Sequence, residues 1–68
     1  MPADKNAALL KYMVDHNAHH AMELEQIAAK FAEEGQMSVS EQIRKAVDEF
    51  QKGNLYLSLA LSSIKEHQ

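Results

Sequence analysis

Apolar residues recur along this chain at alternating spacings of three and four positions, from Leu10 to Phe31 and again from Ile43 to Ile64. This spacing places them on one face of an α-helix, because a helix completes a turn in about 3.6 residues. The first row is Leu10, Met13, Val14, Asn17, His20, Ala21, Leu24, Ile27, Ala28 and Phe31, and the second is Ile43, Ala46, Val47, Phe50, Gly53, Asn54, Leu57, Ala60, Leu61 and Ile64. The pattern predicts two helices, over about 3–34 and about 38–66.

A short loop over 35–37 is predicted to separate the helices. Gly35 suits the left-handed residue that follows a helix, and Ser38 with Glu41 has the spacing of a capping box at the start of the next helix. Two long helices joined by so few residues must run antiparallel. The expected fold is therefore an all-α antiparallel helical hairpin, with residues 1–68 as a single domain.

Gly53 allows a second interpretation of the later half of the chain. Gly53 could end a helix and Asn54 could cap the next one, which would give three helices in place of two. In the two-helix interpretation, a glycine inside a helix costs about 1 kcal/mol relative to alanine. Close packing or a ligand at this level would then explain why the chain has glycine there.

Asn17 and Asn54 interrupt the two apolar rows at matching levels. Pairing the helices about the loop at 35–36 brings these two asparagines opposite each other. A polar pair inside an apolar seam lowers stability but excludes slipped pairings. We interpret Asn17 and Asn54 as a polar layer that sets the register of the hairpin.

The half of the hairpin nearest the chain termini has more apolar residues than two helices can cover between themselves. A chain of 68 residues is also short for a stable domain, and it has no cysteine for a disulfide. A second copy is the simplest cover, so we expect a homodimer that forms a four-helix bundle. The expected dimer interface contains Leu9, Tyr12, Leu55 and Leu59.

Three of the four histidines lie within five positions of the first helix, at the edge of its apolar row. His16 and His20 are four residues apart, and Glu23 follows His20 by three, so all three side chains share one face of the helix. Imidazole and carboxylate groups bind Zn, Ni, Co, Cu or Fe. The cluster predicts a divalent transition-metal site formed by His16, His20 and Glu23, with His19 as an alternate ligand.

The alternative is a metal-free protein-protein interaction module with no catalytic activity. In this alternative His20 is a neutral imidazole bonded to neighbouring amides, and His16 and His19 are solvated. No nucleophile lies beside a recognisable base, so we do not expect an enzyme. A protein partner besides the second copy is compatible with either interpretation.

Charge and hydropathy exclude other partner classes. The net charge of −3, with acidic and basic residues interspersed, provides no basic face for nucleic acid. No apolar run approaches the roughly 20 residues that span a bilayer, and the N-terminus has no apolar leader. We therefore expect no membrane association and a cytoplasmic location.

Overall fold

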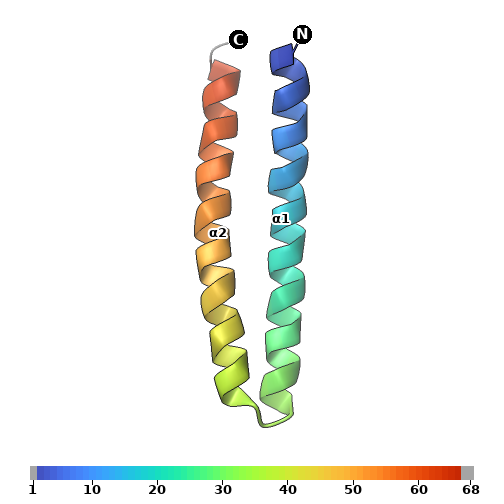
Figure 1. The fold of residues 1–68 in the computed structure, drawn as a ribbon, viewed down its shortest axis with the longest axis vertical. Coiled ribbons are helices and arrows are strands. Elements are labelled where there is room, and N and C mark those ends of the chain that lie inside the picture. The colour runs from blue at the N-terminus through green and yellow to red at the C-terminus, as the bar shows by residue number, and fades with distance from the viewer. Residues whose placement is uncertain (1, 67–68) are drawn as a thin grey trace.

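Two long helices packed side by side make up the fold (Figure 1). The computed structural model describes residues 2–66, and it describes side-chain exposure for residues 5–64. Helix α1 spans Pro2–Glu33 and helix α2 spans Met37–Glu66. The predicted antiparallel hairpin is confirmed, and α2 continues through Gly53 without a break, as in the two-helix interpretation.

The turn between the helices uses backbone hydrogen bonds that are typical of a glycine-terminated helix. Gly35 has a φ of 81°, and its N–H donates to the carbonyl of Ala32 over 3.0 Å. The N–H of Gln36 donates to the carbonyl of Phe31 over 2.9 Å, which completes a Schellman motif. Helix α2 begins directly after Gln36, so Ser38 lies inside its first turn and not at the predicted N-cap position.

The seam between the helices follows a seven-residue repeat. Its a positions are residues 7, 14, 21 and 28 in α1 and 40, 47, 54 and 61 in α2, and its d positions follow each of these by three residues. Among residues 5–64, the buried side chains belong to a positions in the half of the hairpin that contains the loop, and none is large: Ala21, Ala28, Ser40 and Val47. Small side chains allow the two helices to approach closely, so the enclosed core of the hairpin is thin.

The hairpin is a rod and not a rounded domain. Its principal extents are 51 × 15 × 12 Å, and its radius of gyration is 15.7 Å. A compact domain of this length has a radius of gyration of about 11 Å. Side chains that a rounded domain would enclose therefore lie on the surface of this one.

Candidate functional site

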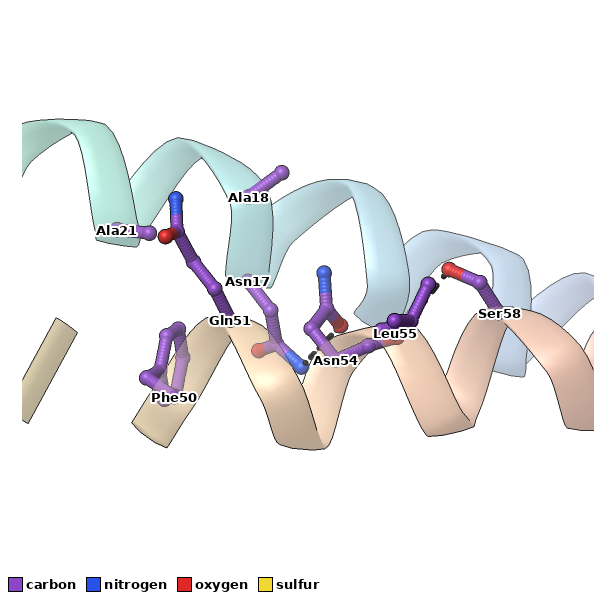
Figure 2. Close-up of a pocket in the computed structure, with 8 residues that line it drawn as sticks. All are labelled: Asn17, Ala18, Ala21, Phe50, Gln51, Asn54, Leu55 and Ser58. Atoms are coloured by element: carbon purple, nitrogen blue, oxygen red, sulfur yellow. Dashed lines mark hydrogen bonds between the residues drawn. The ribbon is translucent and has the colours of Figure 1, made fainter. Parts of the chain in front are cut away.

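The two asparagines of the seam contact each other in the middle of the hairpin. Asn17 Nδ2 donates a hydrogen bond to Asn54 Oδ1 over 3.1 Å, and Asn54 Nδ2 donates to the backbone carbonyl of Val14 over 3.0 Å. Figure 2 shows the Asn17 side chain reaching toward Asn54 on α2. Both side chains are half-buried, so these bonds compensate for the water that the amides lose on folding. Their role in setting the register stays a prediction.

A shallow pocket lies beside this polar pair. Its volume is about 260 Å³, and it is open to solvent on one side. Figure 2 shows the residues that line it: Asn17, Ala18, Ala21, Phe50, Gln51, Asn54, Leu55 and Ser58. Three of the four polar side chains that line it already bond within the chain, since Asn17 bonds Asn54 and the Ser58 hydroxyl donates to the carbonyl of Asn54 over 3.2 Å; the fourth is Gln51. The pocket therefore offers few free polar groups to orient a small molecule.

The histidine cluster forms a linear chain of contacts along the surface of α1. His16 Nε2 and His20 Nε2 are 2.9 Å apart, which is a direct hydrogen bond between the two rings. The other ring nitrogen of His20, Nδ1, lies 3.0 Å from Glu23 Oε1. The second oxygen of Glu23 lies 3.7 Å from His19 Nε2, and the His16 ring stacks on Tyr12 with centroids 5.4 Å apart. All of these side chains are exposed.

The predicted metal site at His16, His20, Glu23 and His19 is wrong. Among the described residues, no group of three or more His, Asp or Glu side chains is arranged to hold a metal ion. Glu23 approaches the ring nitrogen of His20 that points away from His16, so the three predicted ligands do not converge on one point. Two nitrogens sharing a tetrahedral zinc ion would lie about 3.3 Å apart with the ion between them. The spacing in sequence identified a shared helix face correctly, but it did not determine which ring atoms meet.

The four residues predicted for the dimer interface are all exposed. Leu9, Tyr12, Leu55 and Leu59 each have more than half of their surface open to solvent. The seven-residue repeat places them at different positions around the two helices, so they do not share one flat face. Whether a second chain covers them stays a prediction.

A second group of exposed apolar residues was not predicted from the sequence. Leu24, Phe50 and Leu57 occupy d positions of the seam, yet they are 36%, 38% and 37% exposed. Ala28 and Val47, at a positions, are 0% and 2% exposed. The signal was present in the sequence, because the a positions near the loop hold small residues and the d positions hold larger ones. In a two-helix hairpin each d side chain is covered by one partner helix only, so part of a large side chain can stay exposed.

The fold and its exposed residues define a class: a helical hairpin with a thin core, a central polar pair and uncovered apolar residues. The chain belongs to the family described as Domain of unknown function (DUF8180), whose model matches residues 6–64. The match covers most of both helices and the turn. No curated protein and no solved structure matches the chain significantly. Within the described residues, neither helix has a stretch long and apolar enough to cross a membrane.

Proposed function

We propose that this chain is a metal-free protein-interaction module that associates with a second copy of itself to form a four-helix bundle. It has no catalytic activity in this proposal, and the cytoplasm is its expected location. The observation that carries the proposal is the amount of surface that a single hairpin leaves exposed. A second hairpin packed against the first is the simplest symmetric way to cover it.

The accessible surface of one chain supports this proposal. The hairpin exposes 5306 Å². A compact monomer of 7.7 kDa would expose about 4,300 Å². On the same scale, two hairpins that merged into one compact body would together bury about 3,400 Å². This area falls within the range of about 2,000–5,000 Å² that obligate homodimers bury.

The thin core supports the same conclusion. Among the described side chains, the buried apolar ones are Ala21, Ala28 and Val47, which have little apolar area. Burial of apolar area contributes about 25 cal/mol per Å², so this core offers little against the conformational entropy of ordering two long helices. A second chain that covers Leu24, Phe50 and Leu57 would add the missing apolar area.

Sedimentation equilibrium over a range of micromolar concentrations tests the proposal. We expect a mass of twice 7.7 kDa that a metal chelator leaves unchanged. We also expect the midpoint of urea unfolding to rise with protein concentration, because unfolding of a dimer is linked to its dissociation. A helical protein with the monomer mass at every concentration would refute it.

A further inference from the structure

The two sides of the hairpin differ in charge. In an antiparallel pair of helices, the e positions of both helices flank one side of the seam and the g positions flank the other. The e positions include Lys11, Glu25 and Arg44, and Glu25 pairs with Arg44 across the helices over 3.1 Å. The g positions from Asn6 to Ile27 and from Val39 to Ala60 include no Asp, Glu, Lys or Arg: they are Asn6, Met13, His20, Ile27, Val39, Ala46, Gly53 and Ala60.

The exposed d residues lie next to the g positions. In the seven-residue repeat, d and g are neighbours on the helix surface, whereas a and e are neighbours on the other side. Leu24, Phe50 and Leu57 are more than one-third exposed, and their d positions place them beside the g positions, where they widen the apolar surface; Phe50 also lines the pocket on the e side. Met13 and Ile27, each 44% exposed, lie on the same surface. We call this surface, formed by the g positions and these three d residues, the g side.

Small residues on α2 would let another helix approach the g side closely. The g positions of α2 include Ala46, Gly53 and Ala60, and all three are exposed. A Cβ atom added at Gly53 would meet nothing within 4 Å, so the packing of this hairpin does not itself require glycine there. A helix-breaking residue that its own hairpin does not need is explained if a neighbouring backbone passes close to it.

The absence of charge on the g side favours a second copy over a different protein. In a dimer with two-fold symmetry, a residue near the axis faces its own counterpart, so a charged residue there would meet a like charge. The e side, with Lys11, Glu25 and Arg44, would bring such charges together. The g side avoids them, and its apolar residues can pack against the same residues of the other chain.

We infer that two hairpins associate through their g sides, with Gly53 at the closest approach of α2 to the second copy. This inference rests on the proposed self-association and adds the surface that forms it. His20 occupies a g position and then lies within the interface, while His16 and Glu23 lie further out, at its rim. A hydrogen-bonded polar rim around an apolar centre is the usual arrangement of a protein interface.

Two alanines provide a matched test. Ala46 on the g side and Ala18 on the e side are both exposed positions within long helices. Ala46→Arg and Ala18→Arg therefore add the same charge and volume, and arginine is a good helix former. In sedimentation equilibrium, we expect Ala46→Arg to raise the dissociation constant of the dimer at least a hundredfold and Ala18→Arg to change it less than threefold.

A second measurement, thiol labelling, adds no charge to the surface and reports directly whether a position is covered in the dimer. The chain has no cysteine, so Ala46→Cys and Ala18→Cys each introduce one thiol. When the protein concentration rises through the range of dimer formation, the labelling rate of the Ala46→Cys thiol should fall at least tenfold, and that of Ala18→Cys should not. If Ala46→Arg fails to fold, the labelling of Ala46→Cys still tests the inference.

The outcomes separate this inference from the proposed function. A wild-type protein that stays monomeric overturns both. A stable dimer in which Ala46→Cys labels as fast as in the monomer overturns the assignment to the g side alone. The assignment is also overturned if Ala18→Arg weakens the dimer as much as Ala46→Arg does or more. The same holds if dimerisation slows the labelling of Ala18→Cys as much as that of Ala46→Cys or more.

Discussion

Gly53→Ala should have opposite effects on the stability of helix α2 and on the affinity of the dimer. Glycine in a helix interior costs about 1 kcal/mol relative to alanine, and the new methyl group would have open space around it in the single hairpin. The substitution should therefore stabilise α2 in every folded state, whether monomer or dimer. Because this gain is common to both states, it cancels in the dissociation constant.

The interface responds in the opposite direction. If the second hairpin approaches Gly53 closely, the added methyl group overpacks the contact, at a cost of about 1–3 kcal/mol. Both chains contain the substitution, so a cost at the lower limit amounts to about 2 kcal/mol for the dimer and already raises the dissociation constant about thirtyfold. Sedimentation equilibrium measures this change, and circular dichroism should show that helix content is retained.

Lys52→Ala provides the control for Gly53→Ala. Lys52 is the neighbouring residue of α2, and its exposed side chain forms an ion pair with Glu49 at 3.4 Å. Its replacement should leave the dissociation constant unchanged within a factor of about two, since surface ion pairs contribute about 0–1 kcal/mol. If Gly53→Ala leaves the dimer as tight as before or tightens it, no close approach occurs at this residue.

Three further substitutions test the turn, the core and the polar pair, each by urea unfolding at a fixed protein concentration. Gly35→Ala should lower the free energy of unfolding by about 1–2 kcal/mol because the φ of 81° strains any residue with a Cβ atom; an unchanged value would contradict this. Ser40→Ala should raise it by up to about 1 kcal/mol, because the buried Ser40 hydroxyl has no hydrogen-bond partner among the described residues; a clear loss would show that the hydroxyl is bonded. Asn54→Ala should lower it by about 1–3 kcal/mol, since the Asn17 amide loses its acceptor and the Val14 carbonyl loses its second donor; a neutral result would mean that water replaces both bonds.

The hairpin could be predicted from the sequence because its signals are local and repeated. The apolar rows on both helices keep the same alternating spacing, and Gly35 marks the only short break between them. Counting outward from that break brought Asn17 opposite Asn54, and these residues are hydrogen-bonded in the structure. The start of α2 was displaced by one residue, because the Schellman motif at Gly35 and Gln36 lets the helix begin before Ser38.

The site could not be predicted in the same way, because it depends on how side chains are directed. Spacing places His16, His20 and Glu23 on one face, but each imidazole has two nitrogens that point in different directions. In the structure His20 uses one nitrogen for His16 and the other for Glu23, which produces a chain of hydrogen bonds and no cage for an ion. A sequence pattern specifies residue types and helix faces, but it does not specify how each ring is rotated about its side-chain bonds.

The exposed apolar residues follow from the composition of the seam itself. Small residues at the a positions draw the helices together near the loop, where Ala28 and Val47 are buried. The d residues Leu24, Phe50 and Leu57 are covered by one partner helix only, and they remain partly exposed next to the g positions, which have no charge. These d residues and the uncharged g positions thus form one continuous apolar surface, and the proposed pairing of two hairpins would cover it.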